Sequence, residues 1–160
     1  MTEELLIRGG TVVTMDEARR VGALDVRIRG GLIVEVGPSL KGGPARVIDA
    51  TGCAVVPGLV HSHLHLCQVL FRNHAEDRPL LPWLAERIWP LEAAHDPETL
   101  RTSAELGIVE LLLSGATCAL DMGTVGHHDA VFEAARDLGL RAMLQVSLDY
   151  LHGTPAVAAP

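Results

Sequence analysis

Three histidines spaced two residues apart are the strongest chemical feature of this sequence. His61, His63 and His65 follow an apolar stretch that begins at Ala54. Side chains alternate between the two faces of a β-strand, so a strand here would send all three imidazoles to one face. Neutral imidazole nitrogens are good ligands for zinc, iron, nickel or copper. The spacing predicts a metal site, and strand geometry alone leaves open whether His61 pairs with His63 or His63 with His65.

The elements around the histidines predict parallel strands joined by helices. The near-continuous apolar run 55–60 is typical of a strand buried on both faces. After a connection that contains a helical segment at 80–89, Asp96 and Pro97 are a typical helix start, and Gly115 is expected to end that helix. A strand at 116–122, a helix at 130–138 with Asp129 as N-cap, and a strand at 140–148 follow. This order predicts βαβ units.

Residues 5–56 predict a β-rich unit. Residues 5–14 are predicted to form a strand, a Gly-Gly turn and a second strand. Residues 46–50 are predicted to form a further short strand. Between them, residues 24–36 predict a hairpin. A three-residue loop at 29–31 pairs Val26 with Val34 and makes one face wholly apolar, whereas a two-residue loop would place Val26 opposite Glu35. We therefore expect the three-residue loop.

The stretch from Pro57 to His65 resembles the signature of the amidohydrolase superfamily, in which Pro-Gly and an apolar pair precede a His-x-His motif. It is most similar to the branch that holds guanine deaminase, adenosine-type deaminases and triazine hydrolases. The similarity runs from the first strand to about Asp149. The resemblance implies that His63 and His65 are the metal ligands. His61 stands where the family usually has a small polar or acidic residue.

This resemblance also implies a fold and a reaction. The fold is α/β, with residues 1–57 as the N-terminal part of a small β-sandwich and residues 58–160 as the first three βα units of a TIM-type (β/α)8 barrel. The reaction is hydrolysis of a nitrogen heterocycle, an aminopurine or aminotriazine, by attack of hydroxide bound to one divalent metal ion. Zinc is the expected metal, with iron as the alternative. The other ligands and the proton shuttle belong to later strands, so no catalytic residue is assigned.

Two polar residues are candidates for substrate binding. Gln68 completes a His-x-His-x-x-Gln pattern that in guanine-type deaminases places an amide on the base edge, and an amide both donates and accepts. Glu92 matches a position at which adenosine-type deaminases bind the ribose hydroxyls. Val146 stands where that subfamily has a substrate-binding arginine, which speaks against a nucleoside. A solvated loop glutamine and a solvated helix-end glutamate are the structural alternatives.

For three further residues, the sequence gives weaker support for a functional role. Cys67 would face the metal if the strand continued past His65, although a buried reduced thiol is favoured. Arg72 could contact substrate, although a salt bridge with Glu76 or Asp77 is favoured. Asp121, at the end of a predicted strand, could accept a hydrogen bond from a metal-bound histidine, although a structural role is favoured.

Composition limits the classes of function. The 160 residues are 48% hydrophobic and 21% charged, as in globular proteins. A net charge of −7 argues against nucleic-acid and anionic-membrane partners. The three cysteines lack a Cys-x-x-Cys pattern, and no signal peptide or apolar run of the ~18 residues of a membrane span is present. We expect a cytoplasmic protein with a small heterocyclic substrate, homo-oligomeric at full length.

The length of the chain predicts that part of the barrel is missing. A (β/α)8 barrel takes roughly 250 residues, so we expect the N-terminal portion of a longer protein, inactive by itself. Two rival functions share the visible pattern. One is a triazine-type chlorohydrolase, and the other is a non-catalytic fragment that contributes structure or weak metal binding.

Overall fold

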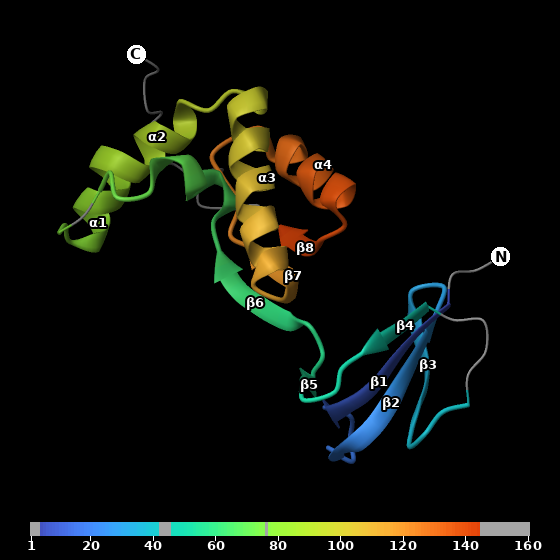
Figure 1. Ribbon diagram of the computed structural model, residues 1–160. Coiled ribbons are helices and arrows are strands. Elements are labelled where there is room, and N and C mark those ends of the chain that lie inside the picture. Colours follow the sequence, from blue (N-terminus) through green and yellow to red (C-terminus); the bar gives the residue numbers. More distant parts are fainter. Residues whose placement is uncertain (1–3, 42–45, 76, 145–160) are drawn as a thin grey trace. The chain divides into compact units, whose positions relative to one another are not determined.

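The structure is a computed structural model that describes residues 4–41, 46–75 and 77–144 (Figure 1). The chain forms two compact units, Met1–Pro57 and Gly58–Pro160. The boundary falls within the Pro-Gly pair that precedes the histidines. None of the helices in the described part of the chain has the length and apolar character that a membrane crossing requires.

The first unit is a five-stranded sheet with the order β3-β2-β1-β4, and β5 also pairs with β1. Strands β2 and β3 run antiparallel to their neighbours, whereas β4 and β5 run parallel to β1. Their bounds are β1 Glu4–Val13, β2 Val21–Arg29, β3 Leu32–Gly37, β4 Arg46–Asp49 and β5 Ala54–Val55.

The predicted Gly-Gly turn in the first segment is wrong, because β1 is one continuous strand. Its pairing with β2 shifts between Ile7 and Gly10, and Gly9 has a φ of 81°. A Cβ on Gly10 would lie 2.7 Å from Cγ2 of Val55. The glycines therefore form an irregularity that lets β1 pass close to its parallel neighbours, a role for which strand glycines are used as well as for turns.

The hairpin between β2 and β3 has a two-residue loop, not the predicted three-residue loop. Ile28 pairs with Ile33, and the loop consists of Gly30 and Gly31. Their φ angles are 58° and 79°. Positive φ at both central residues is the geometry that the right-handed strand twist favours in such hairpins. The expectation of a glycine at positive φ is confirmed, and only the loop length is wrong.

A bulge explains why the apolar face survives this shorter loop. The register shifts between Arg27 and Ile28, so that Val34 is an extra residue of β3. Val26 therefore pairs with Val36 and not with Glu35. Glu35 pairs instead with Arg27, and their side chains form an ion pair of 3.1 Å.

The second unit contains a parallel sheet with the order β6-β7-β8. The predicted alternation of strands and helices is confirmed for the described residues. The element bounds are β6 Leu59–Leu64, the 3₁₀ helix η1 Leu66–Phe71, α1 Leu80–Trp83, the π-helical segment η2 Leu84–Ile88, α2 Trp89–Ala93, α3 Pro97–Leu113, β7 Ala116–Asp121, α4 His128–Leu138 and β8 Arg141–Leu144. Residues 145–148 of the last predicted strand lie outside the described residues.

Both long helices begin and end near the predicted residues. At α3, Asp96 and Thr99 form a reciprocal capping box, and Gly115 follows the helix with a φ of 86°. At α4 the predicted N-cap is wrong by two residues. His127 is the N-cap, in a left-handed conformation with a φ of 57° and without a side-chain cap, and Asp129 lies in the first turn. In the first turn the negative charge of Asp129 still interacts favourably with the helix dipole.

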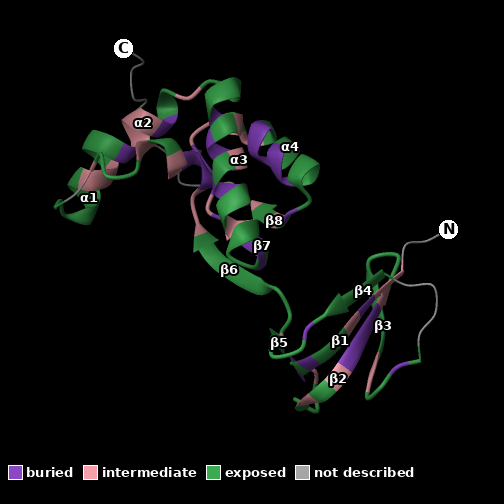
Figure 2. Cartoon of the chain, viewed as in Figure 1, coloured by how far each residue is buried: buried purple, intermediate pink, exposed green. Residues whose placement is uncertain are grey.

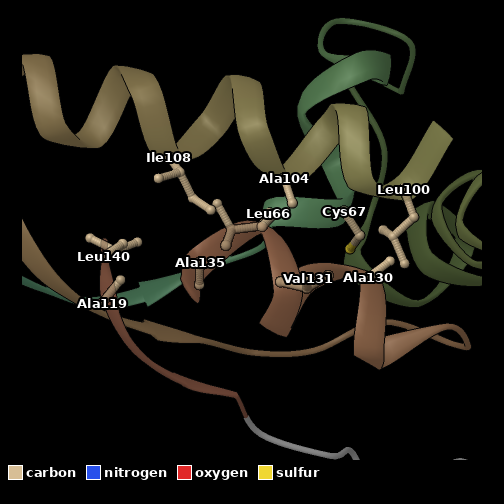
Figure 3. Packing of buried hydrophobic residues seen from close by; sticks show 11 residues of the cluster. Leu66, Cys67, Leu100, Ala104, Ile108, Ala119, Ala130, Val131, Ala135 and Leu140 are labelled. Atoms are coloured by element: carbon tan, nitrogen blue, oxygen red, sulfur yellow. The ribbon is translucent and has the colours of Figure 1, made fainter. Parts of the chain in front are cut away.

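The core of this unit lies between the sheet, η1 and the two long helices. Figure 2 shows buried positions along α3 and α4, and Figure 3 shows the side chains of the cluster. Gly107 allows η1 to lie close to α3, since a Cβ there would be 2.9 Å from side-chain carbons of Leu66 and Val69. The buried members are Leu66, Cys67, Leu100, Ala104, Ile108, Ala119, Ala130, Val131, Ala134, Ala135 and Leu140.

Candidate metal centre

Strand β6 carries His61 and His63, and His65 directly follows it as the N-cap of η1. The start of β6 is fixed against β7. The amide of Leu59 donates to the carbonyl of Gly115 over 2.9 Å. At Gly58 a Cβ would lie 2.1 Å from Oγ1 of Thr117, so only glycine fits there. The expectation of a strand buried on both faces is wrong for the described residues, because Val60 is 71% exposed. In the described sheet β6 is an edge strand, with β7 as its one neighbour.

His63 and His65 lie together. Their ring centroids are 5.4 Å apart with an interplanar angle of 71°. His63 is exposed and His65 half-buried. Nδ1 of His65 is buried without a hydrogen-bond partner in the described part of the chain. Burial, together with the neighbouring His63, lowers the pKa of His65. Two adjacent imidazoles, one of them favoured in its neutral form, fit the donor set that zinc requires.

His61 is exposed and lies at the wall of a cavity. The cavity has a volume of about 650 Å³ and is bordered by β6, η1, the segment around Trp83 and α3. His65 and Gln68 also line it, and His63 does not. His61 and His65 therefore share one hollow, whereas His63 and His65 share a ring contact.

Gln68 and Glu92 are brought together although 24 positions separate them. Nε2 of Gln68 donates to Oε1 of Glu92 over 2.9 Å. Glu92 is only 6% exposed, so it is not a solvated helix-end residue. Burial raises the pKa of the Glu92 carboxyl, and the hydrogen bonds from Gln68 and Cys67 oppose this rise. The pair forms a partly buried polar group beside His65.

Cys67 is buried at 1% exposure. Its Sγ–H donates to Oε1 of Glu92 and to the carbonyl of Gly123, both over 3.4 Å. Burial raises the pKa of the Cys67 thiol, and the carboxylates of Glu92 and Asp121 raise it further. The predicted buried, reduced thiol is thus found, and its sulfur lies among polar groups.

Asp121 holds the backbone that follows the histidines. Its Oδ1 accepts from the amide of Leu66 over 3.0 Å, and its carboxylate also accepts from the amides of Met122 and Gly123. Burial raises the pKa of Asp121 to about 6. The hydrogen bonds described for Asp121 go to backbone amides and not to an imidazole, so the favoured structural role fits better than that of an acceptor for a histidine.

Two residues that hold η1 in place could not be identified from the sequence. Oγ of Ser103 donates to the carbonyl of Leu66 over 2.8 Å. Nε2 of His95 lies 2.8 Å from the carbonyl of Cys67, and because a carbonyl only accepts, this nitrogen carries the proton. Both contacts fix η1 from other elements. A lone serine within a helix and a histidine before an N-cap do not predict such contacts.

Arg72 pairs with Glu110 of α3, with Nη1 and Oε1 2.9 Å apart. Of the two predicted partners, Asp77 is wrong among the described residues, and Glu76 lies outside them. The physical reason is that η1 packs along α3, which places a helix carboxylate nearer than the residues that follow in sequence.

The sequence pattern of the amidohydrolase family matches residues 54–154. The chain belongs to this family. The matched region includes the three histidines, of which His61 and His63 lie in β6 and His65 directly follows it, and also Gln68, Glu92 and Asp121.

Three comparisons show which proteins the chain is similar to. It is 39% identical to the 5'-deoxyadenosine deaminase of Methanothrix thermoacetophila over 140 residues, which is 88% of this chain and 33% of that protein. A zinc-bound adenosine deaminase from Xanthomonas campestris superposes with a TM-score of 0.80 at 33% identity, over 88% of this chain and 33% of that chain. A mutant atrazine chlorohydrolase from Arthrobacter aurescens TC1, in complex with zinc and atraton, superposes with a TM-score of 0.78 at 32% identity. The match covers 88% of this chain and 35% of that chain. The chain spans about a third of the length of the curated relatives it matches.

Proposed function

We propose that this chain is part of a zinc-dependent hydrolase that deaminates an aminopurine. The observation that carries the proposal is the contact between His63 and His65 beside the hydrogen-bonded Gln68–Glu92 pair. In this proposal residues 1–57 belong to a small β-sandwich, and residues 58–160 form the first three βα units of a TIM-type barrel. Metal ligands at the carboxyl end of a barrel strand fit the place where such barrels have their active sites.

One zinc ion would be held by His63 and His65, together with ligands from elsewhere in the enzyme. The ion would activate water as a nucleophile and polarise the ring nitrogen–carbon bond that is attacked. Nδ1 of His65 is buried and has no hydrogen-bond partner among the residues that the structure describes, and the pKa of that ring is lowered. Both observations support a ligand role. The zinc in the solved relatives supports the choice of metal.

Gln68 and Glu92 would orient the substrate. Because the amide nitrogen of Gln68 donates to Glu92, its amide oxygen remains an acceptor for a donor on the base. A purine with an exocyclic amino group provides such a donor. Glu92 offers a carboxylate for ribose hydroxyls, and the two adenosine-type relatives favour a nucleoside over a free base. Val146, which spoke against a nucleoside, lies outside the described residues.

A triazine chlorohydrolase is the second candidate. It is favoured by the similarity to the atrazine chlorohydrolase, whose TM-score is close to that of the adenosine deaminase. The two candidates would share the metal and differ in the leaving group, which is ammonia in one and chloride in the other.

A chimera tests both candidates. Residues 1–144 of this chain replace the matching part of the Methanothrix 5'-deoxyadenosine deaminase, with the parent enzyme as positive control. We expect the chimera to retain zinc and to release ammonia from 5'-deoxyadenosine, and His63→Ala and His65→Ala each to abolish this release. His61→Ala is the matched control and should retain zinc. A folded, zinc-loaded chimera that releases chloride from atrazine but no ammonia from any aminopurine would contradict the proposal.

A further inference from the structure

Three potential metal ligands of different chemical types converge behind the histidine pair. A ring nitrogen of His65, Sγ of Cys67 and a carboxylate oxygen of Glu92 all lie within 4.8 Å of one another. His65 and Cys67 flank the start of η1, whereas Glu92 comes from α2. Side chains from two separate elements thus meet at one point, and His63 is not among them.

Two of these side chains are buried and the third, His65, is half-buried. Cys67 is 1% exposed and Glu92 is 6% exposed, and Nδ1 of His65 is a buried nitrogen for which the described residues offer no hydrogen-bond partner. Figure 3 shows Cys67 within the packed cluster that also contains Leu100 and Ala130. A buried nitrogen without a partner is costly, and a cation would relieve that cost.

The charges of this group balance a divalent cation. A thiolate and a carboxylate contribute two negative charges and a neutral imidazole contributes none, so the three ligands together match the charge of a divalent cation. The thiol proton would be released to solvent as the metal–sulfur bond forms. Thiolate together with imidazole favours zinc or cadmium over the harder magnesium and calcium.

The carboxylate is already held in place. Gln68 donates to Oε1 of Glu92 over 2.9 Å, and the amide of Val125 also donates to this carboxylate. A ligand fixed by surrounding donors loses little freedom when it binds a metal. A cation would replace the weak Sγ–H contacts of Cys67 with Glu92 and with the carbonyl of Gly123, both of 3.4 Å.

We propose that His65, Cys67 and Glu92 form a second site for a soft divalent cation of the zinc or cadmium class. It is distinct from the His63–His65 pair, with which it shares only His65. Because the His65 imidazole would serve both sites, an ion bound by His65, Cys67 and Glu92 would leave His63 without His65 as a second ligand. The proposal needs no hydrolytic activity and stands whether or not the proposed function holds.

X-ray absorption of the 160-residue chain loaded with one equivalent of zinc tests this without any mutation. We expect one sulfur at about 2.3 Å together with nitrogen or oxygen at about 2.0–2.1 Å. A first shell of nitrogen and oxygen alone would overturn the proposal.

Cobalt titration of variants then identifies the sulfur. Cys67→Ser should remove the thiolate-to-cobalt charge-transfer band, whereas the matched variants Cys53→Ser and Cys118→Ser should retain it. His63→Ala should also retain the band although it removes the proposed catalytic pair, which separates this proposal from the proposed function. A band that survives Cys67→Ser, or one that is lost with Cys53 or Cys118, would overturn it.

Glu92→Gln tests the third ligand. It preserves the shape of the side chain and removes its charge, so we expect cobalt affinity to fall at least tenfold with the band still present at saturation. Unchanged affinity would show that the carboxylate does not coordinate and would overturn the three-ligand site. Circular dichroism of each variant establishes that it is folded.

Discussion

The side-chain amide of Gln68 and the carboxylate of Glu92 are joined by a hydrogen bond of 2.9 Å between η1 and α2. The donor is fixed, because a carboxylate can only accept from the amide nitrogen. This bond turns two separately predicted substrate residues into one unit. A change at either residue should therefore affect the binding of substrate.

Glu92→Gln in the chimera should lower kcat/KM for 5'-deoxyadenosine by about 10–100-fold, since a hydrogen bond to a charged group contributes about 1.5–3 kcal/mol. The effect on adenine should be smaller, because the free base has no ribose hydroxyls. Steady-state ammonia release on both substrates measures the ratio. Glu86→Gln is the control, since Glu86 is exposed and pairs with Arg78. Equal losses on both substrates would rule out a contact with the ribose.

Ser103→Ala should destabilise the second unit. The hydroxyl of Ser103 is fully buried and donates to the carbonyl of Leu66, which would be left without this donor. A buried group that loses its partner costs about 1–3 kcal/mol. Ser114→Ala is a matched control, because Ser114 makes a similar bond to the carbonyl of Leu111 at an exposed position. Urea unfolding should give a loss within about 0.5 kcal/mol for the control. Similar losses in both variants would contradict the role of Ser103.

Asp121 should make stability depend on pH. Burial raises the pKa of its carboxyl to about 6. A raised pKa in the folded state means that the stabilising contribution is complete below the ordinary pKa of about 3.9 and is lost as the pH rises through about 6. The difference of about 2 pKa units corresponds to about 3 kcal/mol.

Asp121→Asn removes this titration and keeps an acceptor for the amide of Leu66. We expect the free energy of unfolding of the wild type, relative to the variant, to fall by up to about 3 kcal/mol between pH about 4 and pH about 7. Urea unfolding at both pH values measures this difference. Asp129→Asn, at an exposed position in α4, is the control for the loss of one surface carboxylate. A constant difference between wild type and Asp121→Asn would contradict the prediction.

Local signals determined a large part of this protein from the sequence alone. Asp96, Pro97 and Gly115 define the ends of α3 because capping depends on residues within one turn of the helix. The spacing of His63 and His65 places their rings together because residues two apart on a strand share a face. The Pro-Gly-led motif was sufficient to indicate the amidohydrolase family.

The tertiary structure decided what depends on residues far apart in sequence. Gly58 is required because Thr117, in the neighbouring strand, leaves no room for a Cβ. The bulge at Val34 preserved an apolar face that the hairpin loop alone would have lost. The contacts of Gln68 with Glu92 and of Ser103 with Leu66 form only when α2, α3 and η1 pack together. Sequence patterns report local preference, whereas these contacts depend on which side chains packing brings within hydrogen-bond distance.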